Sequence, residues 1–373
     1  MHDITDDEFE LLGYLLYPYD VQLYRESEGK FDATIDHSDK ARFRITHDKD
    51  ESEAISYEHF RECSKRMRRV MEPRVTAAYR LATSLPFQYT RVPQAIRNRF
   101  LKKRIVDFDL SGHLSLEKMR VSIVQELGKV GVPLQRRHER QILITHDIDT
   151  ERGLRNALSL KAVEEKLNLR STWFLPSQEY RIPKKVARDL GSNSRIGSHD
   201  VKHDGRIICA SNQEQLIERL TTSRLQLEGI FETEVDCFRS PLLQFNRKIV
   251  TALAKSGYRG DFSLPTWEPS SPYAADGFGA EIAQPFAING VVETPLTLFQ
   301  DHQVFYVLNM NPATAVKFWT VQARVIRSLC GDIVLNVHPD YLFSQHLEAY
   351  GELLMELANI HNETQTSDGE KLG

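Results

Sequence analysis

The sequence has few cysteines and no long apolar run, and each absence excludes a class of protein. Its four cysteines, Cys63, Cys209, Cys237 and Cys330, lie far apart and form no Cys-x-x-Cys pair. This spacing excludes a disulfide scaffold and a structural zinc knuckle, so we expect four reduced thiols. The chain also has no run of about eighteen apolar residues, so no membrane-spanning helix is predicted.

Neither sign of charge dominates the sequence. The formal net charge is −4 over 373 residues, so the composition does not indicate a nucleic-acid-binding protein. The N-terminus is acidic where a secretory signal would be basic and then apolar, which predicts a cytoplasmic protein. Two basic clusters, at 65–69 and 97–104, have two interpretations: peripheral contact with an anionic membrane surface or a phosphate, or solvated helix faces.

Length and composition predict one large domain with an accessory region. The chain is 41% hydrophobic and 27% charged, as in ordinary globular proteins, and 373 residues exceed one typical domain. The accessory region, 1–138, shows patterns typical of a hairpin over 21–46, turning at 28–30, and of a long helix over 56–84. We expect it to pack against the main domain, 139–362, and to shape its rim. The polar tail, 363–373, is predicted to be disordered.

Apolar runs and helical patterns alternate from residue 141 onward. The sequence predicts strands at 142–148, 171–175, 195–198, 235–238, 291–295 and 333–337. It predicts helices from 151, near 184, and over 212–230, 247–256, 313–328 and 345–359. Repeated βα units form a parallel sheet, and about seven strands are enough to close a somewhat irregular barrel. The predicted fold class is therefore α/β.

Two acids follow the first of these strands at a spacing of two. Because strand side chains alternate between faces, Asp147 and Asp149 point the same way at the carboxyl end, where α/β folds keep active sites. Farther on, His199 and His203 stand four apart, which places both imidazoles on one face of a helical turn. One carboxylate and two histidines make a metal site, and the other carboxylate can act as a base. Alone, each pair is also typical of a helix cap, a turn or a surface helix.

Four ordered motifs resemble those of the polysaccharide deacetylase (NodB-homology) family of carbohydrate esterases. They are Thr-His-Asp-Ile-Asp at 145–149, Gly-Ser-His-Asp-Val-Lys-His at 197–203, Phe-Arg-Ser-Pro at 238–241 and Leu-Asn-Val-His at 335–338. The resemblance implies a deformed (β/α) barrel that removes an acetyl group from an amino sugar with one divalent metal ion, usually zinc. It implies these roles: Asp149, His199 and His203 as ligands, Asp147 as general base, His338 as general acid, and Arg239 to orient Asp147.

The chemistry of amide hydrolysis gives reasons for these roles. Three protein ligands leave metal positions open, and the leaving amine needs a proton, which His338 can supply at the same end of the barrel. The backbone N–H of Leu242, just after Pro241, can help to hold the oxyanion. The candidates for orienting His338 are Asp261, Glu268 and Glu293. Two alternatives stay open: His338 only caps its strand, and Arg239 is only a structural ion-pair partner.

Other polar residues and departures from the family pattern bear on these expectations. Strand alternation points His146 to the opposite face, where we expect it to be packed or hydrogen-bonded. Asp200 and Asp204 are expected to be turn residues or to orient an imidazole. His146 replaces a usual Phe, and Ile148 separates two acids that are adjacent in many relatives. Residues 242–243 are Leu-Leu where Tyr-Gly is common in the family. The motif therefore does not specify which sugar is the substrate.

The expected function is cytoplasmic deacetylation of an N-acetylated sugar, such as a sugar nucleotide, a lipid-linked sugar or another glycan-biosynthesis intermediate. One alternative is a related amidohydrolase that opens a non-sugar C–N bond. Another is a catalytically silent barrel that binds glycan or serves as an assembly partner. A silent barrel is disfavoured because a binding module needs neither an acid nor a base. The sequence does not specify the acyl group, the physiological metal or the oligomeric state.

Overall fold

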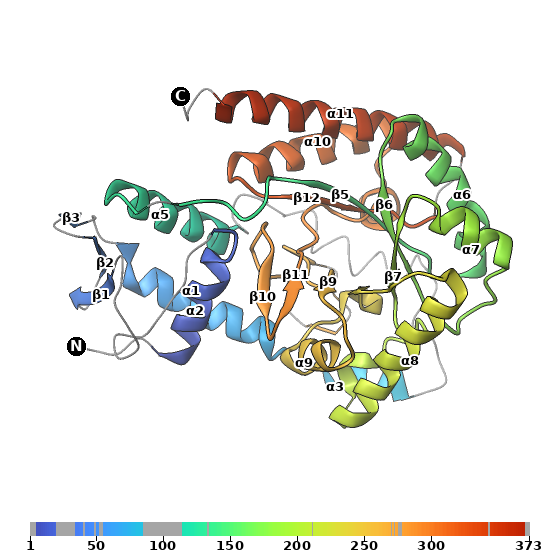
Figure 1. Ribbon diagram of the computed structural model, residues 1–373, viewed down its shortest axis with the longest axis horizontal. Coiled ribbons are helices and arrows are strands. Elements are labelled where there is room, and N and C mark those ends of the chain that lie inside the picture. Colours follow the sequence, from blue (N-terminus) through green and yellow to red (C-terminus); the bar gives the residue numbers. More distant parts are fainter. Residues whose placement is uncertain are drawn as a thin grey trace.

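The structure is a computed structural model that describes most of the chain. The described residues are 5–19, 34–39, 42–47, 50–51, 55–84 and 114–369, apart from 133, 211, 270, 272, 275–277 and 342–343. Within these ranges an eight-stranded sheet lies at the centre of the larger part of the molecule, and helices surround it (Figure 1).

The central sheet is parallel except at one edge. Its strand order is β10-β11-β9-β8-β7-β6-β5-β12, and only β10 runs antiparallel to its neighbour. The strands are β5 (Ile142–Asp147), β6 (Ser171–Leu175), β7 (Arg195–Ser198), β8 (Cys237–Phe238), β9 (Gly260–Asp261), β10 (Phe286–Ile288), β11 (Val291–Glu293) and β12 (Ile333–Asn336). This curled half-barrel confirms the predicted α/β class and the deformed (β/α) barrel.

The chain that follows β11 links the two sides of the curled sheet. The backbone N–H of Thr294 donates to the carbonyl of Asp261 at the end of β9, at 2.8 Å. Farther along, the N–H of Leu298 donates to the carbonyl of Val334 in β12, at 3.2 Å. One short segment therefore contacts both β9 and β12, which brings distant strands of the sheet toward each other.

Helices α6 to α11 cover the sheet from outside (Figure 1). They are α6 (Glu151–Lys166), α7 (Lys184–Gly191), α8 (Gln213–Phe231), α9 (Arg247–Lys255), α10 (Pro312–Ser328) and α11 (Ser344–Gly369). Helices α10 and α11 lie side by side over β12 and β5. Four of the helices begin after a side-chain oxygen that accepts a backbone N–H of the first turn, from Thr150, Asn212, Asn246 and Asn311.

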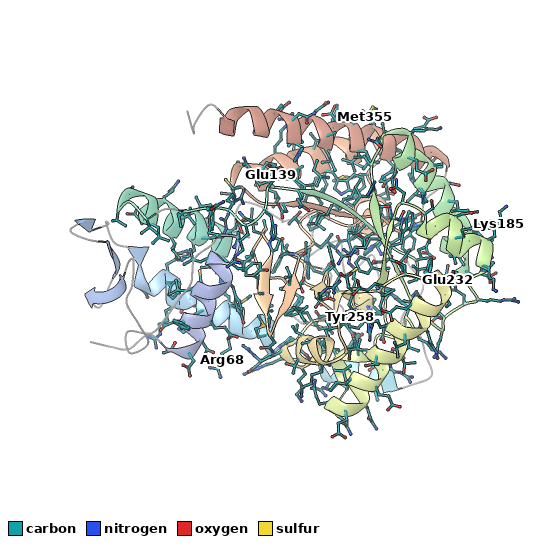
Figure 2. All side chains as sticks on the ribbon, viewed as in Figure 1. Arg68, Glu139, Lys185, Glu232, Tyr258 and Met355 are labelled. Carbon is teal, nitrogen blue, oxygen red and sulfur yellow. The ribbon has the colours of Figure 1, made fainter. Side chains whose placement is uncertain are left out.

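Side chains fill the space between these helices and the sheet (Figure 2). Tyr258 is 3% exposed, and its hydroxyl donates to the carbonyl of Leu220 at 3.1 Å, as a buried tyrosine requires. Lys185, Glu232 and Met355, also labelled in Figure 2, lie exposed on the outside. In the described part of the chain, no helix combines the length and the apolar character needed to cross a membrane.

An antiparallel pair of strands lies in the C-terminal part of the predicted hairpin region, 21–46. Strand β1 (Thr34–Asp39) pairs antiparallel with β2 (Arg42–His47). The predicted turn at 28–30 lies outside the described residues. The short strands β3 (Asp50–Glu51) and β4 (Ile55–Ser56) also pair with β2.

The prediction of one helix over 56–84 is wrong. Helix α2 (Tyr57–Met71) ends shortly before Pro73, and α3 (Ala77–Ser84) begins after it. Proline has no N–H to donate and disfavours helical geometry in the residue before it, so the helical pattern is interrupted there. The basic cluster 97–104 lies outside the described residues, whereas the cluster 65–69 lies in α2.

Several elements were not predicted from the sequence. They are α1 (Asp6–Leu16), α5 (Ser115–Lys129) and a π-helical turn, η6 (Gln303–Val307). Strands β9 and β10 are two and three residues long, too short to show an alternating pattern. The last helix extends to Gly369, past residue 363, where the sequence predicts a disordered tail.

The N-terminal elements pack against the barrel. The ring of Tyr14 in α1 lies 5.1 Å from that of Phe286 in β10. The carboxylate of Glu10 binds the guanidinium of Arg247 in α9, with both N–O distances at 2.7 Å. A single apolar cluster contains residues from α1 and from α11. The region before residue 139 therefore shares its core with the barrel.

Gly197→Ala should destabilise the protein, because β7 has no room for a side chain at this position. A Cβ atom there would lie 2.5 Å from the ring of Phe174 and 3.0 Å from the sulfur of Cys237. Overpacking of this kind lowers the free energy of unfolding by about 1–3 kcal/mol. Urea denaturation measures the change.

Gly229→Ala is the matched control for that variant. Gly229 is exposed within α8, and no neighbouring atom lies within 4 Å of an added Cβ. Alanine is favoured over glycine in a helix interior by about 0.8–1 kcal/mol, so this variant should be slightly more stable than the wild type. If Gly197→Ala were as stable as Gly229→Ala, the close packing of β7 would be contradicted.

Candidate functional site

The carboxyl ends of four strands bring polar side chains to one edge of the barrel. Asp147 ends β5, His199 directly follows β7, Arg239 directly follows β8, and His338 lies two residues past β12. Backbone pairing continues past the strand ends: the N–H groups of His199 and Arg239 donate to carbonyls of the neighbouring strands at 2.8 and 2.9 Å. These hydrogen bonds tie the backbone of the site directly to the sheet.

Asp149, His199 and His203 converge on one point. The Nε2 atoms of His199 and His203 lie 3.4 and 3.6 Å from the same oxygen, Oδ1 of Asp149. The centres of the two imidazole rings are 5.4 Å apart. The prediction that the histidines share a helical turn is wrong, because residues 199–206 form an irregular loop.

Asp200 turns the chain between the two histidines. Its φ is +69°, in the left-handed region that aspartate adopts more readily than most residues. The guanidinium of Arg219 binds the carboxylates of Asp200 and Asp204, at N–O distances of 2.7 and 2.8 Å. Both acids therefore brace the loop through Arg219, while a backbone carbonyl binds the Nδ1 of His199.

Two observations show that the three converging side chains fit a metal ion. Nδ1 of His199 donates to the carbonyl of Arg239 at 2.8 Å, so the lone pair of the neutral ring is on Nε2, which faces Asp149. Oδ1 of Asp149 is buried and has no hydrogen-bond partner within the described residues. A buried carboxylate oxygen without a donor is costly, and a cation held by these ligands would satisfy it.

Asp340 holds the backbone that carries Asp149. Its carboxylate accepts the N–H of Asp149 at 3.1 Å and the hydroxyl of Thr150. The first turn of α6 packs closely against this carboxylate, and a Cβ at Gly153 would overlap it. The candidate ligand on this loop is thus fixed by a residue that lies just after His338 in the sequence.

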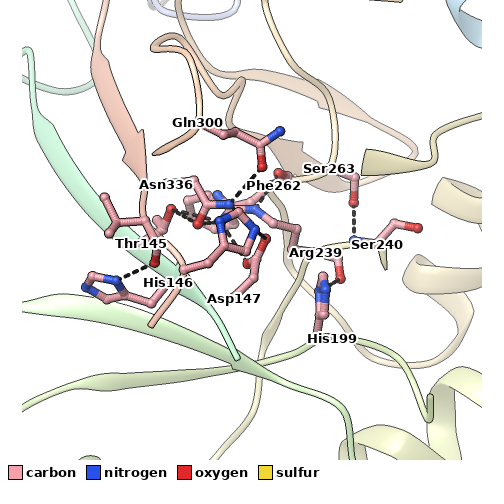
Figure 3. A network of polar contacts seen from close by, with 12 residues as sticks. Thr145, His146, Asp147, His199, Arg239, Ser240, Phe262, Ser263, Gln300 and Asn336 are labelled. Atoms are coloured by element: carbon pink, nitrogen blue, oxygen red, sulfur yellow. Dashed lines mark hydrogen bonds and ion pairs between the residues drawn. The ribbon is translucent and has the colours of Figure 1, made fainter. Parts of the chain in front are cut away.

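Hydrogen-bond donors hold both carboxylate oxygens of Asp147. Nη1 of Arg239 donates to Oδ1 at 3.0 Å, and Nδ2 of Asn336 donates to Oδ2 at 2.8 Å (Figure 3). Burial alone would raise the pKa of Asp147, but neighbouring positive charge, that of Arg239 above all, lowers it below its ordinary value. This carboxylate is therefore ionised and fixed in orientation.

His338 faces Asp147 and is held by an acid that the sequence did not predict. Nδ1 of His338 bonds Oδ1 of Asp301 at 2.6 Å, and its Nε2 lies 3.7 Å from Oδ2 of Asp147. Burial alone would lower the pKa of His338, but the charge of Asp301, with those of Asp149 and Asp147, raises it to about 10. At neutral pH the ring carries a proton on each nitrogen.

The three acids that were candidates for orienting His338 have other partners. Asp261 and Glu293 accept backbone N–H groups of the loop after β9, at 3.1 and 2.9 Å. Glu268 accepts two glutamine side-chain amides, at 3.1 and 2.6 Å. The residue that binds His338, Asp301, follows an irregular segment that belongs to no strand, which is why the sequence did not single it out.

Leu242 lies in a strained turn at the same edge. Leu242 and Leu243 have φ values of +59° and +52°, in the left-handed region. For residues other than glycine, this conformation costs about 1–3 kcal/mol each, and such strain clusters at functional sites. The turn begins two residues after Arg239. That the N–H of Leu242 holds an oxyanion stays a prediction.

His146 points away from the site, as strand alternation predicts. Its Nδ1 lies 2.8 Å from the carbonyl of Val337, and its Nε2 lies 2.6 Å from Oε1 of Glu164. The ring stacks on that of Trp173 at 4.0 Å. The expectation that His146 is packed and hydrogen-bonded is confirmed.

The N-terminal region reaches the loop that carries His203. The hydroxyl of Tyr79 in α3 donates to the carbonyl of Gly205 at 2.8 Å, and the side-chain amide of Gln244 donates to the same carbonyl at 2.7 Å. Gly205 has a φ of +66°, and a Cβ there would lie 2.7 Å from the Tyr79 hydroxyl. A residue from 1–138 thus braces the backbone two positions past a candidate ligand.

Comparisons with known proteins find similarity only among solved structures. No family model matches the sequence, and no curated protein matches it. A proposed polysaccharide deacetylase from Mycobacterium smegmatis has a TM-score of 0.48 at 17% identity, over 63% of this chain and 94% of that one. A family 4 carbohydrate esterase from Streptomyces lividans, in complex with acetate, has a TM-score of 0.40 at 14% identity, over 60% and 90%. A family 4 pseudoenzyme from Bacillus anthracis has a TM-score of 0.40 at 14% identity, over 60% and 62%.

The similar structures are polysaccharide deacetylases and carbohydrate esterases. They come from the family that the four sequence motifs resemble. At 14–17% identity the similarity concerns the fold alone.

His199→Ala should lose most of a bound divalent metal ion, because the two remaining ligands rarely hold zinc tightly. The wild type should carry about one ion per chain. Elemental analysis of both purified proteins by mass spectrometry measures the content. His138→Ala is the matched control, since His138 is an exposed histidine outside the site and its loss should leave the metal content unchanged. Full metal occupancy in His199→Ala would refute the ligand assignment.

Tyr79→Phe should weaken metal binding by up to about tenfold, because it removes the hydroxyl that donates to the carbonyl of Gly205 on the loop of His203, a hydrogen bond worth about 0.5–1.5 kcal/mol. The same hydroxyl also accepts from the side-chain amide of Gln244, and that contact is lost as well. Competition with a chelator measures the dissociation constant. Tyr258→Phe is the control, because it also removes one hydroxyl that donates to a buried carbonyl, but at α8. Equal metal affinity in the two variants would show that Tyr79 does not support the loop.

Proposed function

We propose that this chain is a metal-dependent hydrolase that removes the acetyl group from an N-acetylated sugar. One observation carries the proposal: a three-ligand group with an unpartnered carboxylate oxygen lies beside an ionised carboxylate and a protonated imidazole. Hydrolysis of an amide needs these functions together, since one group must take a proton and another must give one.

Asp149, His199 and His203 would hold the ion in this proposal. Their nitrogen and oxygen donors suit zinc, and three protein ligands are typical of catalytic zinc sites. When bound, such an ion acts as a Lewis acid on a carbonyl oxygen and makes a nearby water more acidic. Together these three ligands would bind one ion per chain.

Asp147 is the proposed general base. Its pKa lies below the ordinary value, so it is ionised at neutral pH and can accept a proton from the attacking water. Arg239 and Asn336 each occupy one of its oxygens with a donor, which orients the carboxylate without protonating it. In this proposal Arg239 orients the base, as the family resemblance implies.

His338 is the proposed general acid. Asp301 holds its Nδ1, so the proton available for transfer is the one on Nε2, which faces the site. That proton would pass to the leaving nitrogen as the C–N bond breaks. The N–H of Leu242 is proposed to hold the oxyanion that forms on the carbonyl oxygen.

The proposed substrate is an N-acetylated sugar nucleotide, lipid-linked sugar or other intermediate of glycan biosynthesis in the cytoplasm. Support comes from the resemblance of the four motifs to sugar deacetylases. Aromatic side chains also line the site: the rings of His302 and Tyr341 are partly exposed and lie 5.4 and 5.5 Å from the ring of His338. Partly exposed aromatic rings suit the apolar face and the hydroxyl edge of a sugar.

An acetate-release assay tests the proposal. Metal-loaded wild type is incubated with a panel of N-acetylated sugar nucleotides, lipid-linked sugars and simple non-sugar acetamides, and acetate is quantified. Acetate from a sugar substrate, lost after chelation and regained on adding zinc, is the expected result. Release from non-sugar amides alone would favour a different amidohydrolase. No release by metal-loaded protein would favour a silent binding barrel.

Asp147→Asn and Asp149→Asn should have opposite effects on metal and turnover. Asp147→Asn should keep the ion and lower kcat by about 10²-fold or more, the usual contribution of a general base. Asp149→Asn should lose the ion, because an amide is a weaker ligand than a carboxylate. Metal content and acetate release, measured on the same preparations, distinguish the two. The reverse pattern would mean that the two roles are exchanged.

A further inference from the structure

Asn336, the last residue of β12, lies at the centre of the polar network in Figure 3. Its side chain is fully buried. Its Nδ2 donates to Oδ2 of Asp147 at 2.8 Å, and its Oδ1 accepts from Nη1 of Arg239 at 2.8 Å. This buried amide therefore contacts both members of the Asp147–Arg239 ion pair, so its role goes beyond packing in the core.

The orientation of this amide is fixed by the chemistry of its neighbours. A guanidinium can only donate, so the atom that faces Arg239 must be the oxygen of Asn336. The nitrogen then has to face Asp147, whose ionised carboxylate can only accept. Thr145 cannot replace it as a donor there, because its hydroxyl donates to the carbonyl of Leu335 at 2.7 Å.

The same amide nitrogen reaches the segment that holds His338. It donates to Oε1 of Gln300 at 3.2 Å, and the next residue, Asp301, binds the imidazole of His338. Asn336 therefore contacts the carboxylate of Asp147 on one side and, on the other, the residue that precedes Asp301. Nε2 of His338 and Oδ2 of Asp147, the oxygen that Asn336 holds, are 3.7 Å apart.

We propose that Asn336 is a positioning residue that sets the plane of the Asp147 carboxylate and its placement relative to His338. This rests on the proposed function, in which Asp147 takes a proton and His338 gives one. Arg239 holds only Oδ1, so the carboxylate could still turn about its Cβ–Cγ bond. The second donor, on Oδ2, removes that freedom and keeps the base aligned through the reaction.

Asn336→Leu tests the proposal, because leucine has a similar volume and no hydrogen-bonding group. We expect kcat for acetate release to fall by about 10- to 100-fold, with KM and metal content close to the wild-type values. Asn336→Asp should lose at least as much, because it keeps an acceptor for Arg239 but places an oxygen against the carboxylate of Asp147. A kcat within about twofold of wild type in either variant would overturn the proposal.

Thr297→Val is the matched control at the other end of β12. The Thr297 hydroxyl donates to the carbonyl of Asp332 at 2.9 Å and accepts the N–H of Val334 at 2.8 Å. This variant also removes buried polar contacts of β12, but it leaves Asp147 untouched. Its kcat should stay within about twofold of wild type, and an equal loss in both variants would show a general effect of strand damage.

A double-mutant cycle separates positioning from structural damage. If Asn336 acts through the carboxylate, Asn336→Leu should cost almost no further activity in an Asp147→Asn background. Additive losses would overturn the proposal.

Crystal structures of wild type and Asn336→Leu give a test that needs no turnover: the Asp147 carboxylate should rotate while the β5 backbone stays in place. An unrotated carboxylate would refute positioning, whereas inactive wild type would refute the proposed function alone.

Discussion

The buried guanidinium of Arg239 is the interaction on which the site depends. It donates to Asp147, Thr145 and Asn336, and through Nε to the carbonyl of Phe262, so one cation connects β5, β12 and the segment after β9. A buried charge is stable only when it is paired and hydrogen-bonded. The curled sheet presents acceptors to Nε and Nη1 of this cation, and the carboxylate that compensates its charge is the one proposed to act as base. Fold and chemistry therefore require the same ion pair.

The parts of the site differ in how they are held. Asp147 and Arg239 stand at strand ends and are fixed by the sheet, whereas the three metal-binding candidates lie in the loops that follow β5 and β7. Those loops are braced by residues distant in sequence: Asp340 binds the backbone beside Asp149, and Tyr79 binds the backbone beyond His203. The proton-transfer groups are thus set by the barrel, and the ligand geometry depends on contacts from several other segments.

The sequence predicted the parts of this arrangement that follow from local patterns. The strands β6 and β7 have the predicted bounds, and strand alternation placed His146 on the opposite face. Because polar residues followed several predicted strands, their meeting at one edge could also be expected. Asp301 could not be found this way, since it follows an irregular segment and becomes relevant only when that segment packs beside β12. Tyr79 was missed for a similar reason: its partner is a backbone carbonyl, which leaves no trace in the sequence.

The contact between Tyr79 and Gly205 has a thermodynamic consequence, because coupling between two equilibria is reciprocal. If docking of α3 favours the loop geometry in which His203 can bind the ion, it strengthens ion binding by some coupling free energy. Binding of the ion then strengthens the docking of α3 by the same coupling free energy. The three ligand candidates all lie after residue 148. The helix whose docking would change when they bind an ion, α3, lies before residue 85. Attachment of the N-terminal helices would then report whether the cation is bound.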